Sequence, residues 1–213
     1  MADTTPNDLA ERLDRMESVD AIRQLASKYA LAVDMRDTDA IVNLYVEDTK
    51  VSREQYGRSA LKASFGRVLR GFRASVHHIG GHVIEFDDSE NAHGIVYCRC
   101  EHEIDDKWVP VYLYYLDTYR RDGGRWYFKR RNPSELYGAD VLERPRAGIV
   151  QWPGVGERRG SWHGHFPSWE TFWNTTPNAE TPLVAAEPPP EGFIDAMRRG
   201  NRRVLPMDFS FSG

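Results

Sequence analysis

Three histidines, His77, His78 and His82, lie close together in the sequence around the glycine pair Gly80-Gly81. An imidazole changes charge near neutral pH, so a histidine can act as a general base, and it can equally ligate a metal ion. A carboxylate that accepts one imidazole N–H fixes the tautomer and makes the other nitrogen a better base. These residue types therefore indicate proton transfer, provided that an acid lies beside one of the histidines.

Asp34 is the acid best placed for that role. Upstream of it, apolar residues recur at steps of three and four, which puts them on one helical face. These residues are Ile22, Leu25, Ala26, Tyr29, Ala30 and Val33. Asp34 stands where this register ends, and an acid at a helix C-terminus is mildly unfavourable. Its carboxylate is either solvated at the helix end or directed into a cavity beneath the helix.

The histidines allow three interpretations. They could ligate a metal together with Asp34 or His102, but residues four apart on a strand lie about 13 Å apart, which disfavours that reading. They could instead hydrogen-bond within a sheet edge. In the third interpretation one of them pairs with Asp34, and whether His77 or His78 faces inward stays open. We expect no metal and no cofactor, because neither a glycine-rich nucleotide loop nor a nucleophile elbow occurs in the sequence.

The elements that must position these residues begin with helices. A first helical segment, a longer helix that carries Tyr29 and two further helices are predicted from apolar spacing and N-cap residues. Their ranges are 7–16, 18–33, 39–45 and 59–69, with N-cap candidates at Asn7 or Asp8, Ser18 and Thr38. A short strand is predicted over 46–52.

From residue 75 onward the periodicity is that of strands. Strands are predicted over 76–86, 92–104, 108–121 and 125–132, with a bulge at the glycine pair. Helices gathered on one face of such a curved antiparallel sheet form an α+β cone with a blind pocket between the layers. Alternate residues of the strand over 108–121 are apolar or phenolic, which suits a hydrophobic, multi-ring ligand.

The sequence predicts a change of organisation after residue 137. Prolines rule out long regular elements over 138–213, but six large aromatics are too many for a disordered linker. They are Trp152, Trp162, Phe166, Trp169, Phe172 and Trp173. We therefore expect domain 1–137 to be followed by an extension that packs on its own or a neighbouring subunit and can cover the pocket. A helical turn over 168–173 and a basic helix over 191–203 are predicted within it.

Composition excludes several function classes. A net charge of −4 and a pI near 6.0 give no electrostatic footprint for nucleic acid. No apolar run approaches the length of a membrane span, and no signal peptide is recognisable at the N-terminus. Cys98 and Cys100 lie along one predicted strand, where a disulfide between them is disfavoured. We expect a cytoplasmic protein.

Several motifs together resemble the SnoaL-like branch of the NTF2-like superfamily over residues 10–135. They are Tyr29-x4-Asp34, Asp37-x-Asp39-Ala-Ile-x-x-Leu-Tyr45, His78-x-x-x-His82-x-Ile-Glu-Phe and Tyr115-x-Asp117-x-Tyr119 followed by the hairpin to Arg131. This branch includes scytalone dehydratases, bile-acid 7α-dehydratases and hexachlorocyclohexane dehydrochlorinases. The resemblance implies a cone-shaped fold and a homotrimer or homodimer.

The resemblance also assigns residues. It places Asp34 as the pocket acid, His78 as the catalytic base, Tyr29 as a hydrogen-bond donor and Arg131 as a pocket arginine. Tyr45, His82, Cys100 and Tyr115 are the expected substrate-binding residues. His82 departs from the asparagine that relatives often carry, and Cys100 stands where the bile-acid enzymes keep an acid.

The expected function is that of a cofactor-independent lyase acting on a hydroxylated aromatic or multi-ring small molecule. Elimination would proceed by dehydration, or through a quinone methide with one-carbon loss as in the diarylpropane lyases of lignin-dimer breakdown. The alternatives are a ketosteroid-type isomerase, an epoxide-opening hydrolase and a non-catalytic binding domain on the same scaffold.

Overall fold

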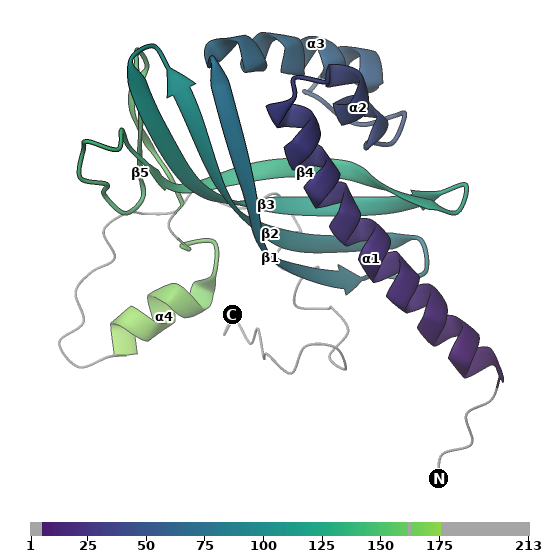
Figure 1. The fold of residues 1–213 in the computed structure, drawn as a ribbon. Helices are drawn as coiled ribbons and strands as arrows, with labels where there is room; N and C mark the ends of the chain where they lie inside the picture. Colours follow the sequence, from purple (N-terminus) through teal and green to yellow (C-terminus); the bar gives the residue numbers. More distant parts are fainter. Residues whose placement is uncertain (1–5, 162, 176–213) are drawn as a thin grey trace.

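The structure, a computed structural model, describes residues 6–161 and 163–175. Within them, three helices precede a six-stranded sheet and a short helix follows it (Figure 1). The elements are α1 (Pro6–Asp34), α2 (Thr38–Asn43), α3 (Arg58–Val68), β1 (Ala74–Phe86), β2 (Asn91–Ile104), β3 (Lys107–Asp122), β4 (Arg125–Gly138), β5 (Ile149–Trp152), β6 (Gly156–Arg159) and α4 (Pro167–Thr175). The predicted α+β class is confirmed, because the N-terminal helices pack on a curved, mainly antiparallel sheet.

Helix α1 is continuous over 29 residues, whereas the sequence predicted a break before Ser18. Pro6 is its first residue, where a missing N–H costs nothing, and no other proline or glycine interrupts it. Ser18 is buried within the helix instead of capping it. The predicted apolar face is buried, which holds the last turn of α1, with Asp34, against the sheet. No helix in the described ranges combines the length and apolarity needed to cross a membrane.

The connection after α1 differs from the prediction in two details. Asp37 rather than Thr38 is the N-cap of α2, because its Oδ1 accepts a 2.9 Å hydrogen bond from a backbone N–H in the first turn. In place of the strand predicted over 46–52, the chain makes isolated bridges, one of which joins Tyr45 to Phe128 of β4. The second helix still places Tyr45 in the core.

Strands β1 to β4 form the predicted antiparallel meander. The β1–β2 register shifts between Ile79 and His82, which confirms the bulge at the glycine pair. Gly123 and Gly124 connect β3 to β4 with φ values of 53° and 77°. Glycine adopts such angles without steric cost, so this hairpin forms where the sequence indicated it.

Strand β4 continues to Gly138, beyond the predicted end at residue 132. Pro133 lies inside it, although proline normally ends a strand because it lacks an N–H. On its other side β4 pairs with β5 only at Gly138, opposite Val150. At Pro133, therefore, no described strand pairs with this other side of β4, and the missing N–H of the proline costs no hydrogen bond there.

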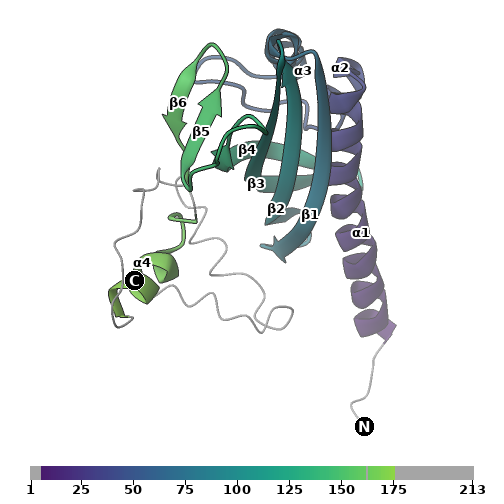
Figure 2. The ribbon, with the colours of Figure 1, turned by 60° about the vertical axis from the view of Figure 1, so that its left-hand side comes forward.

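Strands β5 and β6 were not predicted. They extend the same sheet beyond β4, as Figure 2 shows on the side away from α1. Both strands are four residues long and flanked by proline or glycine, so they carry little periodic signal. The predicted helical turn near residue 168 is confirmed as α4, and the helix predicted over 191–203 lies outside the described residues. The domain boundary at residue 137 stays a prediction.

The described part of the C-terminal segment packs on the outer face of its own sheet. Phe166 contacts a buried outer-face cluster that includes Tyr114 of β3. Tyr114 Oη and His165 Nδ1 are 3.0 Å apart, which fixes the segment at this point. Part of the outer face of the sheet is thus covered by the chain itself.

Candidate active site

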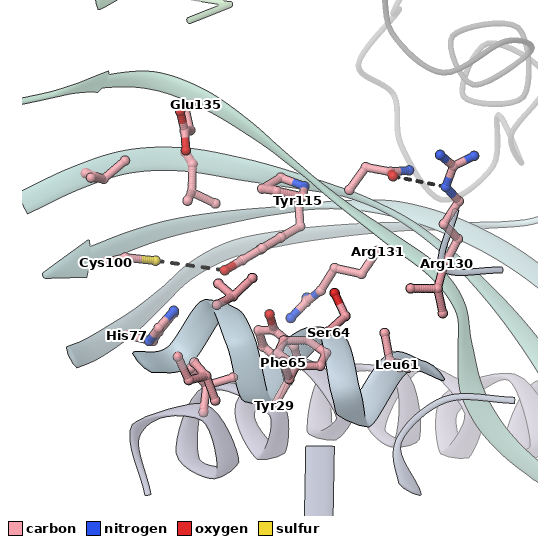
Figure 3. A pocket seen from close by; sticks show the side chains of 18 of the residues that line it. Tyr29, Leu61, Ser64, Phe65, His77, Cys100, Tyr115, Arg130, Arg131 and Glu135 are labelled. Carbon is pink, nitrogen blue, oxygen red and sulfur yellow. Dashed lines mark hydrogen bonds between the residues drawn. The ribbon is translucent and has the colours of Figure 1, made fainter. Parts of the chain in front are cut away.

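A pocket of about 440 Å³ lies between the helical layer and the sheet (Figure 3). This volume is within the range of small-molecule sites. Its wall is mostly apolar and aromatic, with contributions from α1, α3, β2, β3 and β4. The lining residues used below are Tyr29, Tyr45, Lys50, Phe72, His77, Cys100, His102, Tyr115, Arg130, Arg131, Trp152 and Arg158.

His77 lines the pocket and is paired with Asp34 at the end of α1. Nδ1 of His77 lies 2.7 Å from Oδ1 of Asp34, and the His77 backbone N–H donates to Oδ2 at 2.8 Å. The His77 side chain is 5% exposed and that of Asp34 is 23% exposed. Because Asp34 occupies Nδ1, Nε2 is the ring nitrogen available for chemistry in the pocket.

The structure corrects the prediction that His78 is the histidine beside Asp34. Successive side chains of a strand point to opposite faces. His77 is registered opposite Cys100, which lines the pocket, whereas His78 is registered opposite the exposed Arg99 and is itself exposed. His78 therefore lies on the outer face, and His77 takes the place expected for it.

The local contacts keep Asp34 ionised. Its partial burial favours the neutral acid, but hydrogen bonds from His77 and from Ser75 Oγ outweigh burial and hold the pKa of Asp34 below its usual value. An ionised Asp34 can accept the N–H of His77 and stabilise the imidazolium that forms when Nε2 takes a proton. The helix-end position of Asp34 is thus explained by its contacts with β1.

Arg131 lines the pocket, but its charge is compensated by a buried partner. Nε and Nη2 of Arg131 donate to the two oxygens of Asp117, at 2.9 and 2.7 Å. The two side chains are 1% and 0% exposed. Burial disfavours the guanidinium charge, but Asp117 outweighs burial and raises the pKa of Arg131. The pair therefore presents a fixed dipole to the pocket rather than a net positive charge.

The third guanidinium nitrogen of Arg131, Nη1, is not used by Asp117. Nη1 is buried and has no hydrogen-bond partner within the described chain. The guanidinium carbon lies 4.5, 4.1 and 4.4 Å from the ring centroids of Tyr29, Tyr115 and Phe128, which hold it in place. Nη1 is thus a rigidly held donor whose hydrogen-bonding capacity is not used within the described chain.

The three predicted tyrosines all line the pocket. Tyr29, Tyr45 and Tyr115 are each less than 10% exposed. Burial raises the pKa of each above its usual value, although Arg131 opposes the shift. They therefore remain neutral phenols that can donate a hydrogen bond. Tyr29 contacts the His77 ring edge-on, with centroids 6.5 Å apart.

Cys100 lines the pocket as predicted, whereas His82 does not. The bulge after Ile79 carries His82 behind the wall, where its Nε2 lies 2.9 Å from Tyr119 Oη. Tyr119 in turn donates to Asp117 at 3.0 Å. The structure thus corrects the substrate-binding assignment of His82, which instead supports the carboxylate that holds Arg131.

The predicted histidine cluster does not converge. His77 lies in the pocket, His78 on the outer face and His82 behind the wall. Across residues 6–161 and 163–175, no three His, Cys, Asp or Glu side chains are grouped so that they could hold a metal ion.

His102 is a pocket residue that the sequence analysis considered only as a metal ligand. It shares the inward face of β2 with Cys98 and Cys100, at steps of two, and that parity was the signal available in the sequence. Its ring contacts Phe72 and Trp152, with centroids 4.7 and 5.2 Å away. Both aromatics also line the pocket.

The rim of the pocket is positively charged. Lys50, Arg130 and Arg158 line it, and Arg158 is paired with Glu135. Arg130 donates to the amide oxygen of Asn132 at 3.0 Å, so its charge is not neutralised by that contact. In Figure 3 Arg130 and His77 lie at opposite ends of the pocket, with Arg131 between them.

Acid should destabilise this arrangement through His82 and His102. Burial, reinforced by neighbouring Arg131 for His82 and by His77 for His102, lowers the pKa to about 3 for His82 and about 4 for His102. An unfolded histidine titrates near pH 6.5, so below that pH the unfolded chain binds protons that the folded chain does not. The contribution of each histidine to the free energy of unfolding is therefore fully present above pH 6.5. As the pH falls below this value, the contribution of each histidine decreases by about 1.4 kcal/mol per pH unit.

Urea denaturation at pH 7, 6 and 5 measures this effect. The two histidines together should lower the free energy of unfolding by roughly 4 kcal/mol between pH 7 and 5. His82→Gln should remove about half of that pH dependence. An unchanged slope in this variant would show that His82 is already protonated in the folded protein or does not titrate differently on unfolding.

Comparison with known proteins places the fold. A candidate scytalone dehydratase from Novosphingobium aromaticivorans is 26% identical, with a TM-score of 0.54 over 63% of this chain and 93% of that one. A hexachlorocyclohexane dehydrochlorinase (LinA-type3) from Novosphingobium barchaimii is 21% identical, with a TM-score of 0.57 over 62% and 96%. A candidate aromatic ring hydroxylase from N. aromaticivorans is 24% identical, with a TM-score of 0.53 over 60% and 95%.

No curated protein sequence is significantly similar to the chain. The SnoaL-like domain matches residues 14–132, which span α1 to β4 and include the Asp34–His77 pair and Arg131. This match covers more than half of the chain and agrees with the cone of helices and curved sheet described above. The protein therefore belongs to the SnoaL-like domain family, within the NTF2-like superfamily.

Proposed function

We propose that the protein is a cofactor-independent lyase that eliminates water from a hydroxylated aromatic or multi-ring small molecule. The observation that carries this proposal is the His77–Asp34 pair in the wall of a mostly apolar pocket. A candidate scytalone dehydratase among the similar structures supports a small-molecule lyase or isomerase role. A positioned general base of this kind typically accelerates proton transfer by about 10²–10⁴-fold.

In this mechanism Nε2 of His77 removes a proton from carbon, and the electron pair of that C–H bond forms the new double bond. The adjacent C–O bond breaks, and the hydroxyl leaves as water when it receives that proton from the His77 imidazolium. Tyr29 hydrogen-bonds the departing oxygen, while Asp34 stabilises the imidazolium. Nη1 of Arg131 donates to a carbonyl or phenolate oxygen on which negative charge develops.

The pocket favours a substrate with an apolar ring system and one acidic or phenolic end. Its walls are aromatic and aliphatic, and the volume of about 440 Å³ accommodates two rings. Lys50 and Arg130 at the rim favour a negative group at the end remote from His77. A sugar phosphate or nucleotide would leave these aromatic walls unused.

A second reaction is compatible with the same groups. If a benzylic hydroxyl leaves first, a quinone methide forms, and His77 can then accept the proton of a neighbouring primary alcohol. The C–C bond to that carbon breaks, formaldehyde leaves and the electrons return to the ring as a phenolate. The free Nη1 of Arg131 favours this variant, because a phenolate is an oxyanion.

A ketosteroid-type isomerase is the runner-up among rearrangements, because neutral phenols and Nη1 could also polarise a carbonyl. We further propose that the protein works in the reducing cytoplasm, since Cys98 and Cys100 are free thiols with sulfurs 3.4 Å apart. A homotrimer or homodimer remains the expected assembly.

A ligand screen followed by product analysis tests the proposal. Hydroaromatics, sterols and lignin-type dimers, each in neutral and acidic forms, are first ranked by thermal shift. Ligands that stabilise the protein are then incubated with it, and the new conjugated double bond is followed by ultraviolet absorbance. Mass spectrometry separates the two reactions, because dehydration alone lowers the mass by 18 units and dehydration followed by loss of formaldehyde lowers it by 48 units. Ligands that bind tightly but are returned unchanged across the set would favour a binding protein.

A further inference from the structure

Arg36 occupies a backbone position that glycine normally takes. It lies just beyond the C-terminus of α1 with φ of 60°, in the left-handed region. The Asp37 N–H donates to the Ala32 carbonyl and the Arg36 N–H to the Val33 carbonyl, at 2.9 and 3.0 Å. This is the pattern in which helices end, and a glycine there avoids the steric cost of a side chain. A residue kept at such a cost suggests a role for its side chain.

The Arg36 side chain turns back toward the His77–Asp34 pair. Its Nη1 donates to Ser75 Oγ at 2.7 Å and to the Val33 carbonyl at 2.8 Å. Ser75 Oγ then donates to Asp34 Oδ1 at 2.9 Å, and the same oxygen lies 2.7 Å from His77 Nδ1. A continuous chain of hydrogen bonds therefore connects the guanidinium to the imidazole.

The direction of these bonds is fixed by the donors and acceptors available. A guanidinium can only donate, so Ser75 accepts from it with a lone pair. The single hydroxyl proton of Ser75 is then left for Asp34, and the buried position of Ser75 keeps water from competing. A hydroxyl polarised by a cation is a stronger donor, which restrains the carboxylate that orients His77.

We propose that Arg36 is a positioning residue that acts through Ser75 on the His77–Asp34 pair. This inference rests on the proposed function, in which His77 is the base. The guanidinium restrains the orientation of Asp34 through Ser75 and places a positive charge on the far side of the pair. Arg36 itself does not touch the substrate.

A purely structural role would make a different prediction. Arg36 also donates to the Phe72 carbonyl at 3.3 Å, and its guanidinium lies 5.0 Å from the Phe72 ring. These contacts fasten the end of α1 to the segment before β1. If they were its whole contribution, removing the side chain would lower stability and leave the titration of His77 unchanged.

The titration of His77 must be read against every charged or titratable group around it. These are Asp34 and Tyr29 from α1, Arg36 from the following turn, Cys100 and His102 from β2, Tyr115 from β3 and Arg131 from β4. Of these groups, Arg36→Gly changes only Arg36. The variant also restores the residue that the left-handed position prefers, so the fold should be retained.

Three variants test the inference in the full-length protein. Arg36→Gly removes the charge and the donor, Arg36→Lys keeps the charge, and Ser75→Ala breaks the chain while leaving the Arg36 contacts to Val33 and Phe72. The ring signals of His77, assigned with a His77→Gln variant, are followed by NMR against pH, so no substrate is needed. We expect the midpoint of this titration to rise in Arg36→Gly, where a nearby positive charge is lost, and to return toward wild type in Arg36→Lys.

For the reaction, Arg36→Gly and Ser75→Ala should lower kcat about tenfold and change KM less than twofold, since a small misorientation of the base affects the chemical step. Unchanged His77 titration and kcat in both variants would overturn the inference about Arg36 alone. Undiminished turnover in His77→Ala would instead overturn the proposed function, whatever the Arg36 variants do.

Discussion

Replacing His77 by alanine should lower kcat by about 10³-fold, because the only imidazole oriented by Asp34 is lost. Asp34→Asn should have a similar effect, since an amide cannot stabilise the imidazolium that forms during proton transfer. Neither side chain belongs to the apolar core, so both variants should remain folded by circular dichroism. Initial rates on a substrate found in the screen measure the effect.

His78→Ala is the matched control for this prediction. His78 is the adjacent residue of the same type on the same strand, but it is exposed on the outer face. Its replacement should leave kcat and KM within twofold of the wild type. A full loss of activity in His78→Ala together with an active His77→Ala would restore the assignment made from the resemblance and contradict the one made from the structure.

Removing the carboxylate of Asp117 should cause the largest loss of stability. In Asp117→Leu the guanidinium of Arg131 remains buried among three aromatic rings without its partner. Breaking one side of a buried ion pair typically costs about 3–5 kcal/mol, because the remaining charge stays desolvated. For a chain of this size that corresponds to a fall of roughly 10 °C in Tm. Urea and thermal denaturation measure the effect.

The double variant Asp117→Leu/Arg131→Met separates the charge effect from the effect of packing. Apolar residues of similar volume often replace a buried ion pair with little loss, so much of the stability should return. Activity should not return, because the free Nη1 donor is absent. If the double variant were as unstable as Asp117→Leu, the loss would come from the Tyr119 contact or from packing, and the argument from buried charge would fail.

The sequence predicted the parts of the fold that depend on local periodicity and turn chemistry. The apolar face of α1 ends at Val33, which put Asp34 at the end of that face but left open whether its carboxylate is solvated or directed into a cavity. Glycines marked the bulge in β1 and the hairpin between β3 and β4, and in the hairpin both glycines have positive φ, which favours this residue. Tyr29, Tyr45, Cys100 and Tyr115 were expected in the pocket from the resemblance, and all four line it.

Elements without such periodicity could not be predicted. Strands β5 and β6 are too short to show alternation, and each is defined by pairing with a strand already in place. Likewise, β4 can continue past Pro133 because β5 pairs with β4 only at Gly138 and not at the proline. These features follow from neighbours that are distant in sequence.

Only the tertiary structure decided between His77 and His78. Two adjacent residues of a strand point to opposite faces, and the residue pattern does not state which face is concave. The β1–β2 register settles this choice by placing His77 opposite Cys100. For Arg131, the resemblance predicted that the residue lines the pocket. It did not predict that Asp117 neutralises the charge of Arg131, which only the structure shows. The sequence by itself therefore determined which kinds of groups meet in the pocket, and the long-range pairing of strands determined which nitrogen of which histidine can take the proton.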